Sequence, residues 1–425
     1  MSRRRKDYRL LKVVVAVVVV GGAAFAVSHL WTGFREGRLS LGGKTTREAR
    51  VAQARELLAE GKIDEARELL GRIVARAGKG ADASAASVLE QALRMLADVE
   101  QQAGNGTEAK RCLERIYREF PNSPDHADMA VAYAGLLATA GDVDEAKRVY
   151  QDVCDNAPRE LRAPALMGLG RMAEESGELD GQLGAREFYR QAAADAGWDS
   201  AIWNEALDAL GRINVALVFS PRETPECKRY IVKPGDSITS IGNALNTTQG
   251  LLMRANGITE TSILSIGRQL KYTPKDFRVV IERSRLRLFV LDNEGIFKRY
   301  AVGLGKPGRE TTLGAYKIGS KQKDPVWFKP NEGPIPAGDP RNELGTRWMP
   351  LVPDAEGLPK DLGIHGTIAP ETIGKYSSNG CCRLRPHDIE ELYDLVVRST
   401  PVDIVETFQL GQAGHAPDES LAAAP

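Results

Sequence analysis

The chain contains the stretch Ile364-His365-Gly366-Thr367, followed further on by Ser378-Asn379-Gly380-Cys381-Cys382-Arg383-Leu384. His365 lies sixteen positions before Cys381, and Gly380 comes directly before that cysteine. A thiol needs a neighbouring base to react as an acyl acceptor at neutral pH, and a preceding glycine lets backbone N–H groups approach a developing oxyanion. The stretch therefore predicts a cysteine nucleophile with a histidine base. A helix expected over residues 386–397 would present its partly positive N-terminus nearby, which could favour a thiolate.

These residues resemble the active-site signature of the YkuD-type L,D-transpeptidase family, in which His-Gly-Thr is followed by Ser-His-Gly-Cys-x-Arg. The interval from histidine to cysteine matches, and one position departs, because Asn379 stands where the family usually has histidine. The resemblance continues upstream in Thr311-Thr312-Leu313-Gly314 and in Asn342-Glu343-Leu344-Gly345. It covers residues 277–406, which we expect to form a mainly-β catalytic domain of this family.

The resemblance also implies roles for individual residues. Cys381 is the expected nucleophile, and His365 is the expected base to the thiol and then the acid to the leaving amine. The Gly366 backbone carbonyl is expected to orient the imidazole, and the N–H groups of Gly380 and Cys381 to bind the oxyanion. Arg383 suits a substrate carboxylate, because its guanidinium can make two parallel hydrogen bonds. The expected substrate-binding residues are Arg383, Ser378, Asn379 and Thr367. The resemblance requires neither a metal nor a cofactor.

The adjacent cysteine, Cys382, falls where the family usually carries an apolar residue. Its side chain is therefore predicted to point into the core, where burial raises the pKa of a thiol and makes it unreactive. The alternative is that Cys381 and Cys382 form a strained disulfide under oxidation.

Composition limits the classes of protein that this chain can belong to. Its 425 residues are too many for one ordinary domain, and roughly three are expected from length alone. Lys plus Arg equals Asp plus Glu at 57 each, so no overall basic field attracts nucleic acid. Five cysteines without a paired CxxC spacing exclude a disulfide-dense fold and a recognisable zinc site.

The N-terminus, residues 1–31, is predicted to be a basic cytoplasmic tail and a single membrane-spanning anchor. Six basic residues precede an apolar run that begins at Val13 and extends to Trp31. As a helix this run would be about 28 Å long, close to the thickness of a bilayer core. The positive-inside rule would keep the basic tail in the cytoplasm and export everything that follows. A cleaved signal peptide is the alternative, since Ala24-Phe25-Ala26 fits a cleavage site, and it too places Cys381 outside the cytoplasm.

Residues 46–217 are predicted to be helical throughout. Gly61-x-x-x-Glu65-Ala66, Gly104-x-x-x-Glu108-Ala109 and Gly141-x-x-x-Glu145-Ala146 share one frame, and a degenerate fourth copy lies over residues 177–185. The pattern resembles tetratricopeptide-type helical hairpins, which stack into a solenoid. Such a solenoid either recruits a protein partner or serves only as a spacer from the membrane.

Residues 228–274 resemble a LysM module, with a strand, a Pro234-Gly235-Asp236 turn, two helices and a returning strand. A capping residue at Asp236 or Ser237 would start the first helix. The LysM family binds glycans that contain N-acetylglucosamine, so the resemblance implies glycan contacts at Gly235, Asp236 and Asn256. A module that keeps only the shape is the alternative.

Together these regions predict a multidomain chain. It would comprise the anchor, an all-α solenoid, a small α+β LysM module, a mainly-β catalytic domain and a disordered tail over residues 411–425. Export, glycan binding and a thiol nucleophile in one chain predict a peptidoglycan L,D-transpeptidase that forms 3→3 cross-links in cell wall biogenesis. The alternatives are a non-catalytic peptidoglycan-binding scaffold, an L,D-carboxypeptidase or endopeptidase, and a protein-anchoring transferase.

Overall fold

The computed structural model describes residues 46–76, 83–329 and 332–409. The predicted anchor over residues 1–31 and the predicted tail over residues 411–425 lie outside these ranges. Within the described ranges, no helix has the length and apolar character needed to span a bilayer. The described residues fall into two compact units, one ending at Gly168 and the other beginning at Leu169.

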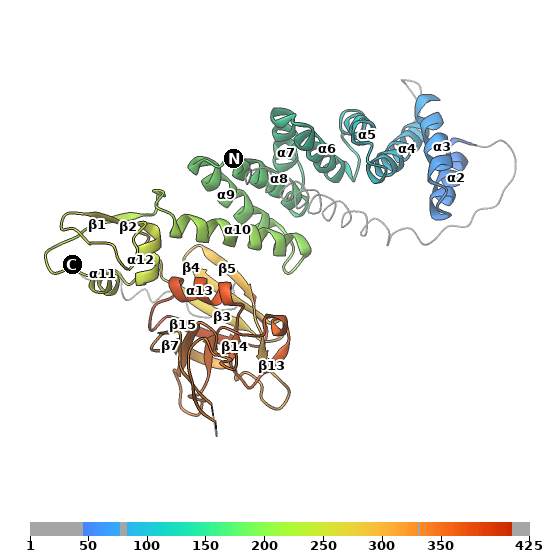
Figure 1. Cartoon of the computed structure of the whole chain (residues 1–425). Coiled ribbons are helices and arrows are strands. Elements are labelled where there is room, and N and C mark those ends of the chain that lie inside the picture. The colour runs from blue at the N-terminus through green and yellow to red at the C-terminus, as the bar shows by residue number, and fades with distance from the viewer. Residues whose placement is uncertain (1–45, 77–82, 330–331, 410–425) are drawn as a thin grey trace, which may run out of the picture. The chain divides into compact units, whose positions relative to one another are not determined.

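The first unit consists of helices that pair in sequence order (Figure 1). Each of three glycines of the repeated frame, Gly61, Gly104 and Gly141, follows a helix with a positive φ, between 75° and 88°, that L side chains rarely adopt. The alanines of the frame, Ala66, Ala109 and Ala146, are 0% exposed, because the next helix packs closely there. The predicted helical hairpins are confirmed. The helices from this unit into the next are α2 (Arg47–Ala59), α3 (Ile63–Arg76), α4 (Ala83–Gln102), α5 (Gly106–Glu119), α6 (His126–Ala140), α7 (Val143–Asn156), the 3₁₀ turn η1 (Arg159–Leu161), α8 (Ala163–Glu175), α9 (Leu179–Asp195) and α10 (Ala201–Phe219).

The LysM region forms a small β-α-α-β module at one end of α10. Strands β1 (Lys228–Ile231) and β2 (Gln269–Tyr272) pair antiparallel, and helices α11 (Ile238–Ala244) and α12 (Gln249–Ala255) lie between them in sequence. Ser237 caps α11 through a reciprocal pair of hydrogen bonds with Ser240, so Ser237 and not Asp236 is the capping residue. The core of the module contains Val232, Ile241, Leu252, Ile258 and Leu270.

The catalytic region is a mixed sheet, nine-stranded over the described residues, with strand order β14-β12-β11-β7-β15-β3-β4-β5 and with β8 paired to β11. Helix α13 (Pro386–Leu395) carries Ile389, Leu392 and Leu395 into the core cluster of this region. The strands of the region are β3 (Arg278–Glu282), β4 (Arg287–Asp292), β5 (Gly295–Ala301), β6 (Leu304–Gly305), β7 (Gly314–Ile318), β8 (Gln322–Lys323), β9 (Trp327–Lys329), β10 (Gly333–Ile335), β11 (Arg347–Pro353), β12 (Gly363–His365), β13 (Tyr376–Ser378), β14 (Cys382–Arg383) and β15 (Pro401–Val405), with a 3₁₀ turn η2 (Pro370–Thr372). Outside the nine-stranded sheet, β9 pairs with β10 and β6 pairs with β13 in two small sheets.

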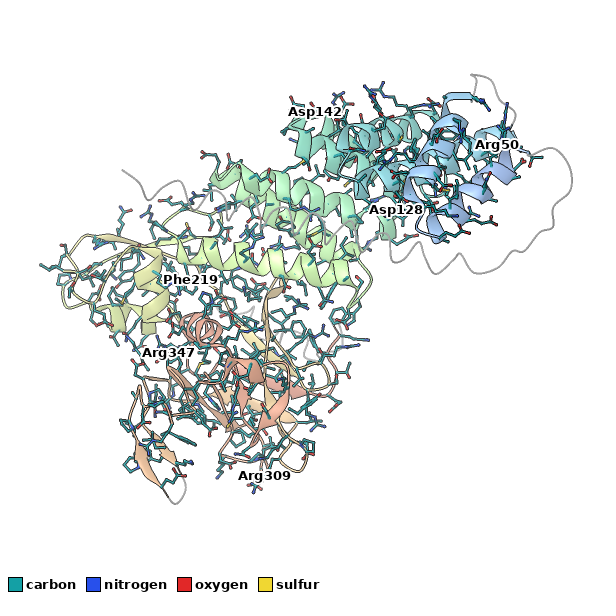
Figure 2. All side chains as sticks on the ribbon, turned by 45° about the vertical axis from the view of Figure 1, so that its right-hand side comes forward. Arg50, Asp128, Asp142, Phe219, Arg309 and Arg347 are labelled. Carbon is teal, nitrogen blue, oxygen red and sulfur yellow. The ribbon has the colours of Figure 1, made fainter. Side chains whose placement is uncertain are left out.

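The second unit joins the last helices, the LysM module and the catalytic sheet through one hydrophobic core. Val215, Val218 and Phe219 of α10 belong to the same buried cluster as residues of β3, β4 and β5. The Asn214 side chain donates a hydrogen bond of 2.9 Å to the Phe297 carbonyl of β5. At the end of α10, labelled in Figure 2, the Phe219 ring lies 3.6 Å from the Arg254 guanidinium of α12. The division of the chain therefore falls within the helical region at residue 168, whereas the sequence suggested a boundary near residue 217.

Candidate active site

The two residues of the predicted catalytic pair come from neighbouring parallel strands. In the pairing of β12 with β14, Ile364 lies opposite Cys382 and His365 lies opposite Arg383. Side chains alternate between the faces of a sheet, so residues two apart on a strand share a face. Cys381, Arg383 and His365 therefore lie on one face of this pair. The opposite face carries Ile364, Cys382 and Leu384, all of which belong to the hydrophobic core.

This alternation separates the two adjacent cysteines. Cys382 is 1% exposed, and burial raises the pKa of its thiol well above the usual value. Cys381 is partly exposed on the other face. The prediction that Cys382 points into the core is confirmed. Because the two side chains leave the backbone in opposite directions, the arrangement does not support the alternative of a disulfide between them.

His365 is buried and closely packed against a neighbouring strand. Its ring lies 5.6 Å from the Trp348 ring, since Trp348 of β11 is directly opposite it in the antiparallel pairing with β12. A Cβ atom at Gly363 would lie 2.3 Å from the Trp348 ring. Only glycine fits there, because the indole covers the backbone of β12. The strand and the indole together fix the position of the imidazole.

The environment keeps the imidazole of His365 neutral. The side chain is 3% exposed, and its Nδ1 is buried with no hydrogen-bond partner in the described part of the chain. Burial, and next the positive charge of Arg383, lower the pKa of His365 to about 4. Hydrogen bonding to the backbone of Gly366, Leu344 and Glu343 opposes part of this fall. At neutral pH the imidazole is an unprotonated base with a free nitrogen.

The thiol of Cys381 is also neutral at rest. Burial raises its pKa, and hydrogen bonding to the backbone of Gly363 only partly offsets this effect. Its Sγ lies 3.8 Å from the Asp361 carbonyl oxygen, to which it can donate weakly. The sequence suggested that the N-terminus of the following helix could favour a thiolate. Helix α13 begins at Pro386, beyond β14, and its effect on the thiol stays a prediction.

A buried hydrogen-bond network shapes the backbone around Cys381. Gly380 has a φ of +124°, which L side chains rarely adopt. The Thr311 hydroxyl, 1% exposed, donates to the Gly380 carbonyl at 2.7 Å and accepts from the Gly305 N–H at 3.0 Å. The Ser378 hydroxyl donates to the Cys381 carbonyl at 2.6 Å and accepts from the Gly380 N–H at 3.2 Å. These two hydroxyl groups hold the turn that carries the thiol.

Three residues that were expected to contact substrate or an oxyanion already use their polar groups within the chain. Ser378 was predicted to contact substrate, but it is 1% exposed and its hydroxyl is used within the turn. Thr367, also predicted to contact substrate, is buried and accepts a hydrogen bond of 3.0 Å from the Ala369 N–H. The Gly380 N–H already donates to Ser378, so it is not free for an oxyanion in this arrangement. Asn379, by contrast, is exposed at the tip of the turn.

Arg383 lies beside the pair formed by Cys381 and His365. Its side chain is 13% exposed and donates from Nη2 to the Glu343 carboxylate at 2.7 Å. Its Nε is buried and, within the described residues, has no hydrogen-bond partner. The guanidinium therefore has one donor group, Nε, that no described residue uses, and this group is closed to solvent in the present arrangement.

Sequence reasoning gave no role to three residues that build this site. Thr311 and Glu343 stood within matched motifs but had no assigned function, and Trp348 stood in none. The Thr311 hydroxyl bonds to two backbone groups that are far apart in the sequence, and the Trp348 indole covers Gly363. Both contacts depend on which residues lie opposite one another in paired strands. One sequence alone carries no signal for either contact.

The glycan contacts predicted in the LysM module have mixed support. Gly235 is exposed with a φ of +85°. The Asp236 carboxylate accepts hydrogen bonds from the Lys233 N–H at 2.7 Å and the Tyr230 hydroxyl at 2.8 Å, which lower its pKa. The Asn256 side chain bonds to backbone groups of Leu252 and Lys271 and does not reach the turn at residues 235–236. Asp236 and Asn256 thus both stabilise the module itself.

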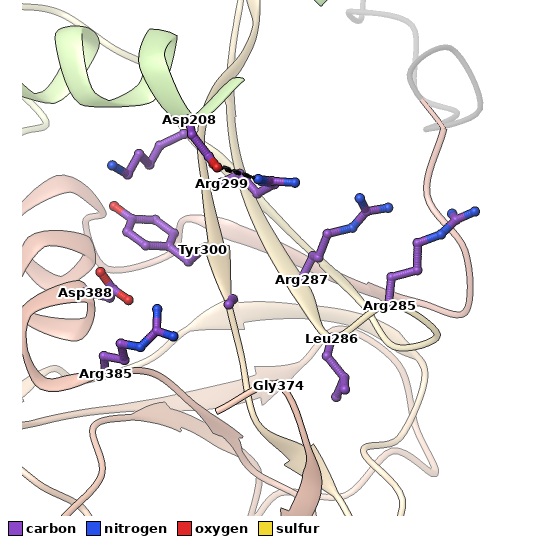
Figure 3. Close-up of a pocket in the computed structure, with 11 residues that line it drawn as sticks. Asp208, Arg285, Leu286, Arg287, Arg299, Tyr300, Gly374, Arg385 and Asp388 are labelled. Carbon is purple, nitrogen blue, oxygen red and sulfur yellow. Dashed lines mark hydrogen bonds and ion pairs between the residues drawn. The ribbon is translucent and has the colours of Figure 1, made fainter. Parts of the chain in front are cut away.

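A cavity of about 400 Å³ lies outside the candidate site, between α10, the strands β4 and β5, and the start of α13 (Figure 3). Arginine side chains surround it, but most are neutralised. Arg299 pairs with Asp208 at 2.7 Å, as the dashed line in Figure 3 marks, and Arg287 pairs with Glu282 at 2.8 Å. Neither the thiol nor the imidazole of the candidate site lines this cavity.

Comparison with known proteins gives three family matches and several relatives. Family models match residues 276–404 as an L,D-transpeptidase catalytic domain, residues 230–273 as a LysM domain and residues 94–160 as a tetratricopeptide repeat. The putative L,D-transpeptidase YqjB of Bacillus subtilis is 34% identical over 131 residues, which cover 30% of this chain and 70% of that protein. The putative L,D-transpeptidase YkuD of the same organism is 31% identical over 182 residues, which cover 41% of this chain and 97% of that protein.

A solved structure of an L,D-transpeptidase from Mycobacterium tuberculosis H37Rv aligns with 33% of this chain and 64% of its own chain. Its identity of 17% and TM-score of 0.26 are too low to support an assignment. The family matches and the two Bacillus relatives confirm the resemblances found in the sequence.

Proposed function

This chain belongs to the L,D-transpeptidase family, and from that premise we propose that it cross-links peptidoglycan through an acyl-enzyme on Cys381. One observation carries the proposal. A partly exposed thiol, a neutral imidazole with an unpaired Nδ1 and a guanidinium with an unpaired Nε lie on the same face of two paired strands. These groups supply a nucleophile, a base and a carboxylate-binding group.

The proposed donor is a stem peptide with a diamino acid at position three and D-Ala at position four. The Cys381 sulfur attacks the carbonyl carbon of the amide between these residues, and the thiol proton passes to His365 Nδ1. The tetrahedral intermediate collapses as His365 returns that proton to the amide nitrogen. D-Ala leaves as a free amine, and the donor remains attached to Cys381 as a thioester.

An amine from the diamino acid of a neighbouring stem then attacks the thioester carbon. Its proton passes to His365 and on to the departing sulfur, which restores the thiol and leaves a 3→3 amide cross-link. One amide bond is exchanged for another, so the reaction needs no oxidant and no external energy source.

The two neutral groups set how the reaction starts. Since the pKa of Cys381 is raised and that of His365 is lowered, a resting thiolate–imidazolium pair is disfavoured. The proton transfer therefore accompanies the attack on the substrate. The Cys381 N–H is the proposed oxyanion donor, and the Gly380 N–H can join it only by releasing Ser378.

The accessory regions extend the proposal. We propose that the LysM module binds the glycan strands and that residues 1–31 anchor the chain in the cytoplasmic membrane, with the catalytic region outside the cytoplasm. The exposed Gly235 turn is the part of the module that stays available for a glycan. A protein partner for the helical repeats is still a prediction.

Analysis of muropeptides tests the proposal and separates it from its alternatives. Cells that carry the gene, cells that lack it and cells that express Cys381→Ser are compared by mass spectrometry. Loss of 3→3 dimers in both altered strains supports the transpeptidase, whereas a change in tripeptides alone indicates hydrolysis. Equal profiles for wild type and Cys381→Ser, with a change only on deletion, would indicate a non-catalytic scaffold.

A further inference from the structure

The Arg383 guanidinium already holds a carboxylate that belongs to the chain itself. The Glu343 Oε2 lies 2.7 Å from Arg383 Nη2, so the Glu343 side chain occupies a donor group of the residue proposed to receive the substrate. We propose that Glu343 is a specificity-determining residue: it competes for Arg383 and yields only to a donor that brings its own carboxylate. This inference rests on the proposed function.

The backbone that carries Glu343 is fixed on both sides. The Asn342 side chain, which is buried, donates to the Pro325 carbonyl at 2.9 Å and to the Pro336 carbonyl at 3.1 Å. Gly345 has a φ of +66°, and a Cβ there would lie 3.0 Å from the Thr367 nitrogen. These contacts hold the backbone of the segment, so rotation of the Glu343 side chain is the smallest movement that releases Arg383.

The Glu343 side chain is more exposed to solvent than the Arg383 side chain, as its release from the ion pair requires. The Arg383 side chain is 13% exposed, whereas the Glu343 side chain is 43% exposed. Water can solvate the glutamate once it rotates out, but the arginine stays in place beside His365. Ion pairs that are partly exposed to solvent contribute little net free energy, so the exchange of one carboxylate for another has a small cost.

The position of Arg383 relative to the thiol selects the carboxylate. Two residues on a strand are about 6.5–7 Å apart, so the guanidinium approaches the region just beyond the carbon that Cys381 attacks. In the proposed donor, the carboxylate nearest to that carbon is the terminal carboxylate of D-Ala at position four. A substrate with this group can replace Glu343 at Nη2 and, once the Glu343 side chain has rotated away, also bond to the neighbouring Nε, which has no partner within the described residues. A substrate without it gains nothing from displacing Glu343.

Glu343 therefore affects which donors bind productively, those with a terminal carboxylate or those without one, and does not take part in the chemical step. Without a carboxylate in the donor, the pair between Glu343 and Arg383 persists and blocks the guanidinium. When the donor has a carboxylate, that group replaces the Glu343 carboxylate on Arg383 with little net change in free energy. Specificity of this kind comes from a built-in competitor that penalises the wrong ligand.

The test compares Glu343→Gln with the wild-type full-length chain on two donors. One donor is a tetrapeptide stem that ends in the D-Ala carboxylate, and the other is the same peptide ending in D-alaninamide. Acylation of Cys381 is followed by intact mass over a range of donor concentrations. We expect Glu343→Gln to narrow the preference for the acid donor about two- to fivefold with kcat unchanged, because the carbonyl group of the amide donor can then bond to a guanidinium that the glutamate had blocked, which lowers the KM for that donor. The KM for the acid donor, which displaces Glu343 at small cost, should change little.

Glu332→Gln is the matched control. Glu332 lies upstream of Glu343 and is ion-paired with Lys329 at 2.5 Å, but it does not contact Arg383. This variant should leave both donors unaffected. Equal losses of kcat on both donors in Glu343→Gln would show that the glutamate only supports Arg383, and no change on either donor would show that it does not compete; each result overturns the inference. If the wild type forms no acyl-enzyme with either donor, the proposed function fails first and the inference falls with it.

Discussion

Ile364 of β12 lies directly opposite Cys382 of β14, and both side chains are buried in the core of the sheet. In a parallel pair this register places the preceding residue, Cys381, beside Gly363 on the opposite face. Strand alternation therefore turns the side chains of these two adjacent cysteines to opposite faces, and only Cys381 shares a face with His365.

The first prediction separates the two cysteines with a β-lactam of the carbapenem type as a thiol trap. Cys381→Ser and His365→Ala should abolish or strongly slow adduct formation, because each removes a partner of the proton transfer. Cys382→Ala should keep the adduct and lose only stability, through a small cavity in the core. Intact mass after incubation gives the adduct, and thermal unfolding gives the stability. An adduct that survives in Cys381→Ser but not in Cys382→Ala would reverse the assignment.

The second prediction concerns pH. Since the pKa of His365 is lowered to about 4, the rate of acylation should stay level from neutral pH down to about 5 and fall below about 4. An ordinary histidine would give a fall near its usual pKa of about 6.5. Arg383→Gln removes the second cause of the shift, so the fall should move to higher pH while burial keeps it below 6.5. Stopped-flow acylation across this range measures both profiles.

The same shift predicts a loss of stability in acid. Below the unfolded pKa of about 6.5 the unfolded chain takes up a proton at this histidine, whereas the folded chain does so only near pH 4. Stability contributed by the neutral buried imidazole should therefore fall as the pH drops from about 6.5 to 4. Urea unfolding of the wild type and of His365→Gln at several pH values measures the contribution of His365 to the pH dependence of the free energy of unfolding. If both proteins lose stability in parallel, the histidine is not the group responsible.

The third prediction tests the contact between Gly363 and Trp348. Gly363→Ala would bring a methyl group within 2.3 Å of the indole, so it should displace either the ring or the strand that carries His365. We expect a lower melting temperature and at least a tenfold slower acylation. Trp348→Phe removes the far edge of the ring and should recover part of both losses when it is combined with Gly363→Ala. A double variant no better than Gly363→Ala alone would mean that the clash is relieved elsewhere.

The fourth prediction concerns Thr311 as a positioning residue. Thr311→Val keeps the shape but leaves the Gly380 carbonyl and the Gly305 N–H without their buried partner, which costs about 1–3 kcal/mol. Acylation should slow by more than stability alone explains, because the turn before Cys381 loosens. Thr311→Ser keeps the hydroxyl and should retain most of the rate. Similar rates for Val and Ser at a temperature where both are folded would contradict a positioning role.

The fifth prediction concerns the division of the chain. A fragment of residues 277–406 lacks α10, whose Val215, Val218 and Phe219 complete the core of the catalytic sheet. Full burial of side chains of this size stabilises a fold by about 1.5–3 kcal/mol each, against a typical net stability of 5–15 kcal/mol. The fragment should aggregate or unfold at a much lower temperature than residues 163–409, which keep α10. Equal melting temperatures for the two fragments would show that α10 is dispensable.

The sequence by itself predicted the candidate nucleophile and base and determined the repeating elements. His365, Gly380 and Cys381 could be identified as candidates because a cysteine nucleophile needs a base and a flexible preceding residue, and these residue types occur close together in the sequence. The helical hairpins followed from glycines that end helices with positive φ and alanines that permit close packing. The LysM module was predicted from its Pro234-Gly235-Asp236 turn and the elements on either side of it. Each of these depends on contacts between residues that are close along the chain, and the residue types record such contacts directly.

Only the tertiary structure decided which groups are free to react. Ser378 and Thr367 are buried, burial raises the pKa of the Cys381 thiol, and the Glu343 carboxylate pairs with Arg383. The division at residue 168 likewise depends on the packing of α10 against strands that lie far along the chain. Exposure, desolvation and strand register arise from residues brought together across long stretches of sequence. A single sequence does not record those distances, so these features followed only from the folded chain.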